Sequence, residues 1–590
     1  MAFRVTGRVL SVRPRADGSF GVMVGPGPNV YFYVTNEPPR LGDDLTLVAD
    51  DVVNTTVDWH GRKGNMGVLR GAQQQLVSPK YATRVVAPEW VSRVKASMRR
   101  PLYRYQAEGA GWMAAQLAAS KGAMLADEAG LGKSSQTVAA ICATRLFPCI
   151  LVCPASLKVN WKREFMFAWQ PPTIEIVEGR KGELRGADVV IINYDLLSFR
   201  ETQLNLVHAR SIVFDEAQEI KEPRPRASHR AAVATRLVAG IGKALLLTGT
   251  PIMNRPAELW RLLHLVDSHG WPSFDEFMWR YCREPAEARP GVKAQRRIVT
   301  NYGKAERLDE LQARMAPVFL RRRKTEVLTD LPPKSRKTQL VSIDFHDMQQ
   351  YRAAERDVVA WLKETASSEK ARAAAAAKAI VKLTMLRRIA AVGKMRHAVP
   401  QYIQHWFDRP QIEPLVIFAY HRQVLDQLFQ LTKHLGLRVV GLGGHENAEG
   451  RQRVVDAFQE GKADVFIAPI KTAVGITLTR SNESLFVERT WTPSQMTQAE
   501  DRQYRIGQLR PVTATYIDAA GTVDEHIAAV LEAKQMLISS VVDGAEASDD
   551  TFLTVKEVVD RFMASAGERA EADVSVEPPP EREPAGEEQA

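Results

Sequence analysis

Apolar residues recur along this chain in patterns that change from region to region. Before about residue 85, the runs FRVTGRVLSVR, FGVMV, VYFYV and DLTLVADDV are rich in β-branched and aromatic residues and are separated by Gly, Pro and Asp. Short runs of this kind predict a small antiparallel barrel or sandwich. Such a module is consistent with an oligonucleotide-binding barrel, and equally with a domain that only packs on its neighbour.

From about residue 100, nearly continuous apolar runs alternate with amphipathic segments. The first set is CILVC (149–153), VVIIN (189–193), SIVFD (211–215) and ALLLT (244–248). The second set is LVIFA (415–419), LRVVGLG (437–443), DVFIAP (464–469), LFVE (485–488) and TATYID (513–518). Parallel strands that are buried on both faces have this pattern. We therefore predict an α/β fold with two tandem doubly wound parallel-sheet domains.

Residues 255–410, between the two sets, have a mostly helical pattern. They include EKARAAAAAKAIVKLTMLRRI, in which almost every residue favours a helix. The positive face of this helix fits a position near DNA, and it equally fits a solvated surface.

Charge is distributed unevenly along the 590 residues. The whole chain carries +10, whereas residues 567–590 hold eight acids and two arginines. That tail has the composition of a disordered segment. The rest of the chain then carries about +16, which favours a polyanionic partner such as nucleic acid.

The cysteines and the lengths of the apolar runs argue against a zinc-binding, secreted or membrane-spanning protein. The four cysteines, Cys142, Cys149, Cys153 and Cys282, form no pairs at zinc spacing and are expected to be reduced core thiols. The first residues, MAFRVTGRVLSVRP, lack the apolar region of a signal peptide, and no run is long enough to cross a bilayer. We therefore expect an intracellular, cytoplasmic protein with no membrane partner.

The stretch LADEAGLGKSSQT (125–137) ends like a phosphate-binding loop, although Asp127 stands where the usual spacing places the first glycine. It follows an apolar run and precedes a predicted helix, so the amides of residues 130–134 would converge on a phosphate. Lys133 would reach the β and γ phosphates, and Ser134 would hold Mg²⁺.

SIVFDEAQEI supplies the acids that such a site needs. Asp215, at the end of a predicted buried strand, would hold the Mg²⁺ shell, and Glu216 would act as a general base on the attacking water. A charge pair at a helix N-terminus would look the same in isolation. The position of this pair about eighty residues after the loop favours the catalytic interpretation.

QAEDRQYRIGQ (498–508) supplies arginines. Gln498, Arg502 and Arg505 would share one face of a helix, because their spacing is i, i+4 and i+7. Such a face is often only solvated. If the second α/β domain closes on the first, the two arginines would act as arginine fingers.

These motifs together resemble the Swi/Snf-type ATPases, the DNA-translocating branch of the superfamily II helicases, over about residues 100–535. LYRYQAEGAGWM is similar to the Q motif, and LADEAGLGKSSQT to motif I, in which an aspartate at the position of Asp127 is usual. The other similar segments are CPASLKVNWKREF, DEAQ (215–218), LTGTPIMNRPAELW, FLRRRKTEVLTDLPPK, VIFAYHRQVLDQL, KTAVGITLTRSNESLFVERTWTPSQMTQAEDRQYRIGQ and GTVDEHI. Gln218, Ser134 and Tyr504 depart from the commoner His, Thr and His, which puts the kinetics in doubt more than the activity.

The resemblance implies two RecA-like domains with ATP and Mg²⁺ as cofactors. The implied catalytic residues are Lys133, Asp215, Glu216, Arg502 and Arg505, and the implied metal ligands are Ser134 and Asp215. The implied nucleotide contacts are Gln106, Asp127, Glu128, Ala129, Gly130, Leu131, Gly132, Lys133, Ser134, Gln218, Gly475 and Gln498. Thr248 and Thr250 would link the nucleotide state to the grip on DNA.

The resemblance also implies an organisation for the chain. We expect a β-barrel-like accessory domain (1–85), RecA-like domain 1 (86–265), a helical insertion (266–410), RecA-like domain 2 (411–545), a C-terminal helix (546–566) and the acidic tail (567–590). The region around LRRIAAVGKMRHAVPQYI looks most like the annealing-helicase branch.

The expected function is an ATP-dependent monomeric motor on double-stranded or branched DNA, in a bacterial cell or, if phage-encoded, in the host cytoplasm. The β domain would serve a protein partner, bind single strands or only pack. The alternatives are an RNA helicase of the same superfamily and a nucleic-acid-binding scaffold with weak ATPase activity.

Overall fold

The computed structural model describes most of the chain. The described residues are 3–14, 20–25, 30–35, 44–49, 51–59, 62–70, 73–77, 87–222, 229–252, 256–282, 307–328, 330–365, 369–410, 413–443, 446, 448–472, 475–543 and 562. The predicted acidic tail (567–590) and nearly all of the predicted helix at 546–566 lie outside them. The chain divides into unit 1, Met1–Leu331 with Met536–Ser548, and unit 2, Pro332–Gln535 with Asp549–Ala590.

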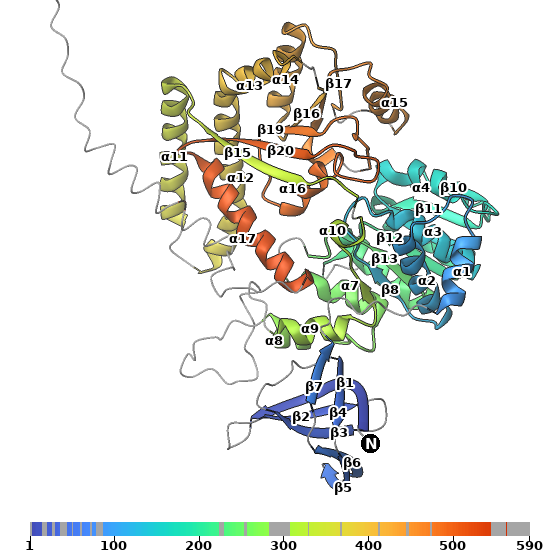
Figure 1. Ribbon diagram of the computed structural model, residues 1–590. Coiled ribbons are helices and arrows are strands. Elements are labelled where there is room, and N and C mark those ends of the chain that lie inside the picture. The colour runs from blue at the N-terminus through green and yellow to red at the C-terminus, as the bar shows by residue number, and fades with distance from the viewer. Residues whose placement is uncertain are drawn as a thin grey trace, which may run out of the picture. The chain divides into compact units, whose positions relative to one another are not determined.

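The first seventy-seven residues contribute a seven-stranded sheet (Figure 1). Its strands are β1 (Phe3–Pro14), β2 (Phe20–Gly25), β3 (Val30–Thr35), β4 (Asp44–Ala49), β5 (Asp51–Trp59), β6 (Arg62–Arg70) and β7 (Gln73–Val77). They pair in the order β5-β6-β3-β2-β1-β4-β7, antiparallel except for β3 with β6. The four expected runs correspond to β1, β2, β3 and β4, and β6, β7 and most of β5, which the apolar pattern did not indicate, extend the sheet.

A second seven-stranded sheet lies in unit 1, and all its pairs are parallel. Its strands are β8 (Ala123–Leu125), β9 (Cys149–Cys153), β10 (Ile174–Ile176), β11 (Val189–Asn193), β12 (Ser211–Asp215), β13 (Ala244–Leu247) and β14 (Phe319–Leu320). The order β10-β11-β9-β12-β13-β8-β14 is that of a doubly wound sheet. Every residue of β9, β11 and β12 is buried, as their continuous apolar runs predict.

Helices precede, connect and follow these strands, and those between parallel strands form the crossover connections that such pairs require. They are α1 (Pro88–Ala96), α2 (Arg104–Ala118), α3 (Lys133–Thr144), α4 (Lys158–Phe165), α5 (Leu197–Leu206), α6 (Arg230–Ile241), α7 (Glu258–Val266), α8 (Phe274–Tyr281), α9 (Leu308–Met315) and α10 (Lys324–Val327). The helix predicted directly after the phosphate loop is α3.

Unit 2 contains a six-stranded parallel sheet in the order β15-β20-β19-β16-β18-β17. Its strands are β15 (Lys334–Val341), β16 (Leu415–Ala419), β17 (Val439–Gly441), β18 (Val465–Pro469), β19 (Glu483–Phe486) and β20 (Val512–Ala519). The helices are α11 (Phe345–Thr365), α12 (Glu369–Lys394), α13 (Ala398–Phe407), α14 (Arg422–His434), α15 (Ala448–Gln459), α16 (Pro493–Glu500) and α17 (Val523–Asp543). Two parallel-sheet α/β units are thus present, as the sequence predicts.

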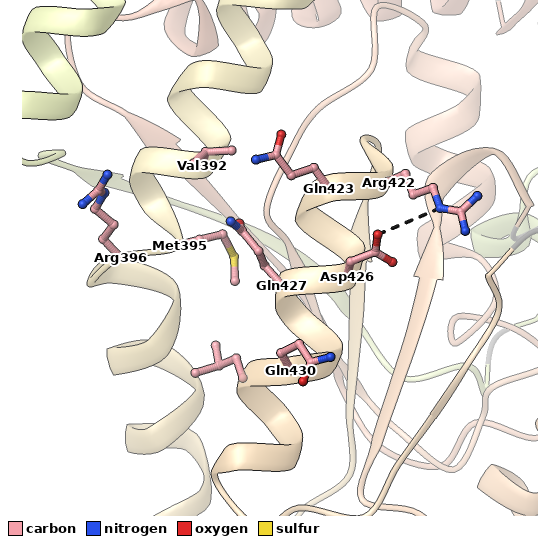
Figure 2. Close-up of a pocket in the computed structure, with 9 residues that line it drawn as sticks. Val392, Met395, Arg396, Arg422, Gln423, Asp426, Gln427 and Gln430 are labelled. Atoms are coloured by element: carbon pink, nitrogen blue, oxygen red, sulfur yellow. Dashed lines mark ion pairs between the residues drawn. The ribbon is translucent and has the colours of Figure 1, made fainter.

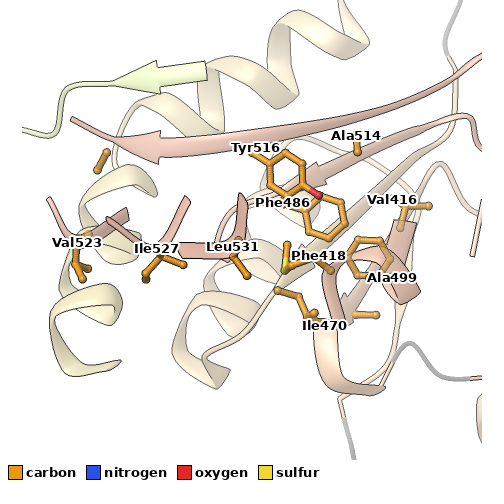
Figure 3. Close-up of a cluster of buried hydrophobic side chains, with 14 of the residues drawn as sticks. Val416, Phe418, Ile470, Phe486, Ala499, Ala514, Tyr516, Val523, Ile527 and Leu531 are labelled. Atoms are coloured by element: carbon orange, nitrogen blue, oxygen red, sulfur yellow. The ribbon is translucent and has the colours of Figure 1, made fainter. Parts of the chain in front are cut away.

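The sheet of unit 2 is covered on both faces. Alternate residues of β16 enter different clusters: Val416 and Phe418 pack with side chains of α11, α12 and α15–α17, whereas Leu415 and Ile417 pack with side chains of α13 and α14. Figure 3 shows the first cluster, in which Phe418, Phe486 and Tyr516 stack across neighbouring strands with centroids 5.0 and 4.7 Å apart. This alternation is why the strands read as continuous apolar runs.

The region predicted as a helical insertion also contributes β14 and β15, one strand to each sheet. β14 is two residues long, and the residues of β15 are mostly exposed and polar. Neither has an apolar pattern that predicts a strand. No helix among the described residues is both long enough and apolar enough to cross a membrane.

Candidate functional site

The predicted phosphate loop joins β8 to α3, and its two described glycines at positive φ make that turn. Gly130 has φ +91° and Gly132 has φ +75°, a region that favours glycine. Gly132 is also the N-cap of α3, so the free amides of the first turn of this twelve-residue helix follow the loop directly. The backbone here provides the amide donors and positive dipole end that bind phosphate.

Lys133 is the first residue of α3, and its ammonium group lies against the loop. Nζ donates to the carbonyl oxygens of Asp127 at 2.7 Å and Glu128 at 3.4 Å. Burial lowers the pKa of Lys133, while the charges of Glu216, Asp127 and Asp215 oppose that effect. Lys133 therefore shares one electrostatic environment with the acids that end β12.

Asp215 is a buried carboxylate with oriented oxygens. Oδ2 accepts a hydrogen bond from Nε1 of Trp161 at 2.7 Å, and Oδ1 accepts one from the backbone N–H of Glu216 at 3.0 Å. Burial, and then the charge of Glu216, raise the pKa of Asp215 to about 7, although Trp161 and Lys133 act in the opposite direction. A nearby divalent cation would favour the ionised form.

Glu216 adopts φ +53°, which is unusual for a residue with a side chain. Backbone strain of this kind costs on the order of 1–3 kcal/mol and persists where the surroundings hold it. Its Oε2 accepts from Nε2 of Gln218 at 2.7 Å, and Oε1 of Gln218 accepts from the hydroxyl of Thr248 at 2.7 Å. The amide at position 218 thus joins the carboxylate after β12 to the residue after β13.

The chain of contacts continues to Thr250. Oγ1 of Thr248 accepts from the backbone N–H of Thr250 at 3.0 Å. Oγ1 of Thr250 is buried and has no hydrogen-bond partner in the structure. Since buried polar atoms are nearly always paired, this hydroxyl is suited to a polar ligand.

The same end of the sheet carries Gly249 close to Lys133. A side chain added at Gly249 would place its Cβ 3.5 Å from Nζ of Lys133 and 3.6 Å from the backbone nitrogen of Ala129. The residues after β8, β12 and β13 therefore meet at one edge, as the carboxyl ends of neighbouring parallel strands do.

The remaining residues predicted to bind the nucleotide in unit 1 are tied to the loop. Nε2 of Gln106, in α2, donates to the carbonyl oxygen of Leu131 at 3.2 Å, and its Oε1 accepts from the backbone N–H of Tyr103 at 3.1 Å. The carboxylate of Asp127 is fully buried and is bound by Arg322 and Gln136, and the carboxylate of Glu128 accepts from the backbone N–H of Lys324. Ser134 lies in the first turn of α3.

In unit 2 the prediction that Gln498, Arg502 and Arg505 share a helix face was wrong. α16 ends at Glu500, and turns follow because Gln503 is drawn inward: its Nε2 donates to Oγ of Ser481 at 2.9 Å and to the carbonyl oxygen of Glu483 at 2.8 Å. Only Gln498 lies within the helix.

Another loop nevertheless brings the two arginines together. NH1 of Arg505 donates to the carbonyl oxygen of Ile476 at 3.0 Å, and NH1 of Arg502 donates to the same oxygen at 3.5 Å. Gly475, the neighbouring predicted residue, has φ +79°. The segments GITLT (475–479) and QYRIGQ (503–508) are therefore held next to each other within unit 2.

Two contacts were missing from the sequence interpretation. Trp161, inside the motif-like segment CPASLKVNWKREF, orients Asp215, and Tyr194 donates from its hydroxyl to the carbonyl oxygen of Asp215 at 2.7 Å. Both aromatic residues carry a polar donor that needs a partner when it is buried. A buried Trp or Tyr therefore indicates that some acceptor lies nearby, but the sequence alone does not show which residue supplies it.

A separate open pocket of about 740 Å³ lies between α12 and α14 (Figure 2). Glutamines, the Arg422–Asp426 ion pair at 3.9 Å and a few apolar residues line it. None of the predicted site residues is among them, so this pocket is distinct from the phosphate-loop site.

Comparison with known proteins agrees with these motifs. The SNF2-related domain matches residues 105–392, and the helicase conserved C-terminal domain matches residues 397–507. The chain belongs to the SNF2-related family. Membership implies nucleotide binding by the SNF2-related domain, and residues 105–392 include every predicted site residue of unit 1.

Individual proteins are also similar to this chain. The chain is 31% identical over 487 residues to the SWI/SNF-related matrix-associated actin-dependent regulator of chromatin subfamily A-like protein 1 homolog of Caenorhabditis elegans, covering 80% of this chain and 65% of that protein. It is 30% identical over 435 residues to the DNA annealing helicase and endonuclease ZRANB3 of Mus musculus, covering 71% of this chain and 39% of that protein. The chain thus spans roughly two fifths to two thirds of the length of these relatives.

Among solved structures, the Sulfolobus solfataricus SWI2/SNF2 ATPase core in complex with dsDNA is similar at 24% identity and a TM-score of 0.36. The alignment covers 79% of this chain and 97% of that one.

Proposed function

We propose that this chain is an ATP-hydrolysing motor that acts on double-stranded or branched DNA. The observation that carries the proposal is the convergence of Lys133, Asp215 with Glu216, and the unpaired hydroxyl of Thr250 at one edge of a parallel sheet. Family membership adds the class of chemistry to that geometry.

The residues fit a magnesium nucleotide. The described residues contain no group of three or more His, Cys, Asp or Glu able to hold a metal ion alone. Mg²⁺ commonly takes one or two protein ligands and completes its shell with water and phosphate oxygens. Ser134 and Asp215 would be those ligands, and the bound ion would neutralise charge that develops on the phosphates.

Each side chain then has a defined task. Lys133, whose ammonium group lies against the carbonyl oxygens of Asp127 and Glu128, binds the β and γ phosphates. Glu216 accepts a proton from the attacking water, and Gln218 orients its carboxylate. Trp161 and the Glu216 amide hold Asp215 in one rotamer, which preserves the geometry for the ion.

The contribution of unit 2 belongs to the proposal as well. Arg502 and Arg505 are assigned the stabilisation of charge during phosphoryl transfer. The positive balance of the chain supports binding through DNA phosphates, so motion would be largely independent of sequence and binding would weaken as salt rises. We propose a monomer in the cytoplasm, with the N-terminal sheet available to a protein partner.

A rate measurement tests the class and the substrate together. ATP hydrolysis is measured without nucleic acid and with duplex DNA, forked DNA, single-stranded DNA or RNA. Duplex or forked DNA should stimulate hydrolysis most. Stimulation by RNA alone would indicate an RNA helicase, and binding without hydrolysis would indicate a scaffold.

Two substitutions assign the chemistry. Lys133→Ala and Glu216→Gln should each lower DNA-stimulated hydrolysis by at least about 10²-fold, because each removes a group that acts on the transition state. DNA binding, measured by fluorescence anisotropy, should persist. A variant that keeps wild-type hydrolysis would refute the role given to that residue.

The similarity to an annealing helicase, found in a relative of which this chain covers 39%, favours branched DNA over simple duplex. A forked substrate should then give a higher kcat/KM than a blunt duplex of the same length and composition. Equal values would leave a duplex translocase as the function.

A further inference from the structure

The segment FLRRRK (319–324) is similar to the family's sequence pattern but has no part in the proposed hydrolysis. In unit 1 it runs beside the phosphate loop. The backbone N–H groups of Ala126 and Glu128 donate to the carbonyl oxygens of Leu320 and Arg322 at 2.7 and 3.1 Å. The pairing of β14 with β8 therefore continues past both strands and into the loop.

The side chain of Arg322 reinforces this pairing. Nε and NH2 bind the two carboxylate oxygens of Asp127 at 3.0 and 2.5 Å. NH2 also donates to Oε1 of Gln136 at 2.7 Å, and Nε2 of Gln136 donates to Asp127 at 3.1 Å. NH1 donates to the carbonyl oxygen of Tyr105 in α2. One guanidinium thus joins α2, the loop and α3.

This network is buried and closely packed. Asp127 and Gln136 are fully buried, and the side chain of Arg322 is 12% exposed. A side chain at Gly109 in α2 would place its Cβ 2.1 Å from Oε1 of Gln136 and 2.5 Å from NH2 of Arg322. Glycine at position 109 is therefore a condition for the network to form.

The network acts on the atoms that hold Lys133. Nζ of Lys133 donates to the carbonyl oxygens of Asp127 and Glu128. Arg322 binds the carboxylate of Asp127, and the backbone N–H of Lys324 binds the carboxylate of Glu128. In addition, NH1 of Arg321 donates to the carbonyl oxygens of Ala126 at 2.9 Å and Gly249 at 3.2 Å. Movement of this segment would displace the backbone around the phosphate-binding lysine.

We propose that Arg322 is a positioning residue for the nucleotide: through Asp127 it holds residues 126–128, and thereby Lys133, where the triphosphate binds. The inference rests on the proposed function for the identity of the nucleotide. It explains the aspartate in place of the usual glycine, because that carboxylate receives a bidentate arginine and turns its charge away from the phosphates. Arg322 itself contacts no reacting atom in this assignment.

The test uses the full-length chain with substitutions at two neighbouring arginines. Arg322→Ala removes the network, and Arg322→Lys keeps the charge but loses the planar fork. Arg323→Ala is the matched control, because the Arg323–Glu326 pair at 2.7 Å lies on the exposed side of the segment. The readouts are the Kd of a fluorescent ATP analogue, the KM and kcat of hydrolysis, and the thermal unfolding midpoint.

A positioning role predicts a specific pattern. Arg322→Ala should raise the analogue's Kd and the KM for ATP at least tenfold and lower kcat/KM about 10²-fold, as displacement of a binding group does. Arg322→Lys should show the same changes to a smaller degree, and Arg323→Ala should stay within twofold of wild type. Asp127→Asn combined with Arg322→Ala should add little to the loss caused by either change, because both act through one contact.

A merely structural role predicts something else. The folded fraction would fall, kcat per total protein would fall with it, and KM and Kd would stay at their wild-type values; that result overturns the proposal. If Arg322→Ala does not fold, Arg322→Lys and Gly109→Ala, which remove no charge, carry the test, and wild-type KM and Kd in both would overturn it. If the wild-type protein does not hydrolyse ATP, the proposed function is refuted. The Kd values of the fluorescent ATP analogue for the wild type and the Arg322 variants would still test the role of Arg322.

Discussion

Buried carboxylates serve different purposes in the two α/β units. Burial and the neighbouring Glu216 raise the pKa of Asp215 in unit 1, whereas Lys334 and Arg336 lower the pKa of Glu500 in unit 2 against the effect of its burial. Glu500 binds Lys334 at 2.5 Å and Arg336 at 2.8 Å, and it also accepts from the hydroxyl of Tyr516. Asp215 is oriented mainly by neutral donors.

The contrast shows how to separate a site acid from a structural acid. A carboxylate that is oriented by neutral donors retains the capacity to bind a cation. A carboxylate that already holds two cations of its own unit contributes to folding instead. Both are buried acids near strand or helix ends, so burial alone does not distinguish them.

The largest expected effect concerns the cations of unit 2. Arg505→Ala should lower ATP hydrolysis by about 10³- to 10⁵-fold if it acts as an arginine finger. Arg505 donates to the Ile476 carbonyl oxygen and the Thr477 hydroxyl, and the loss of these two hydrogen bonds should cost the folded protein only about 1 kcal/mol each. Stopped-flow hydrolysis and thermal unfolding measure the two effects. A large loss of stability with unchanged turnover per folded molecule would mean that Arg505, like Arg336, stabilises the fold and takes no part in hydrolysis.

A second change tests the structural acid. Glu500→Gln should destabilise the protein by about 3–5 kcal/mol, because it removes the carboxylate shared by the largely buried Lys334 and by Arg336 and leaves Lys334 paired with Asp501 alone. Urea unfolding followed by circular dichroism measures this free energy. ATP affinity of the folded fraction should stay unchanged, and a selective loss of ATP binding would contradict the assignment.

The pH dependence of stability should also show that ionised Glu500 stabilises the fold. The folded pKa of Glu500 is below its ordinary value, so its contribution is present above the unfolded pKa of about 4.3 and is lost as pH falls through the folded value. The difference in unfolding free energy between wild type and Glu500→Gln should therefore shrink below about pH 4. Urea titrations at several pH values measure it, and a difference independent of pH would refute the ionic account.

The smallest expected effect on stability concerns Thr250. Thr250→Val should change the unfolding free energy by no more than about 1 kcal/mol, since Oγ1 is buried without a partner in the structure. Hydrolysis should nevertheless fall, because the hydroxyl is assigned to a ligand. Thr248→Val is the comparison, as it breaks the bond to Gln218 and should destabilise more. Wild-type hydrolysis in Thr250→Val would remove this residue from the site.

The sequence predicts much of this arrangement for a clear reason. Buried parallel strands require unbroken apolar runs, and β9, β11, β12 and β16 begin and end where those runs do. Asp215 was predicted as a site acid because it is the last residue of such a run. The phosphate loop was found because its glycines and its lysine have local conformational and chemical requirements.

What the sequence did not predict depends on contacts between distant residues. β14 is recognisable only through its partner β8, because a two-residue strand has no periodicity of its own. The ion pair of Asp127 with Arg322 joins residues 195 positions apart. The helical spacing predicted for Arg502 and Arg505 was wrong because the inward bonds of Gln503 interrupt the helix.

Trp161 gives the site an intrinsic optical reporter. Its indole N–H is bound to the carboxylate assigned to the metal, and its ring is 2% exposed. Any ligand that draws charge from Asp215 would change the field on that ring and therefore its emission. Although the chain has eleven tryptophans, subtracting the spectrum of Trp161→Phe would isolate this signal and report occupancy without any attached dye.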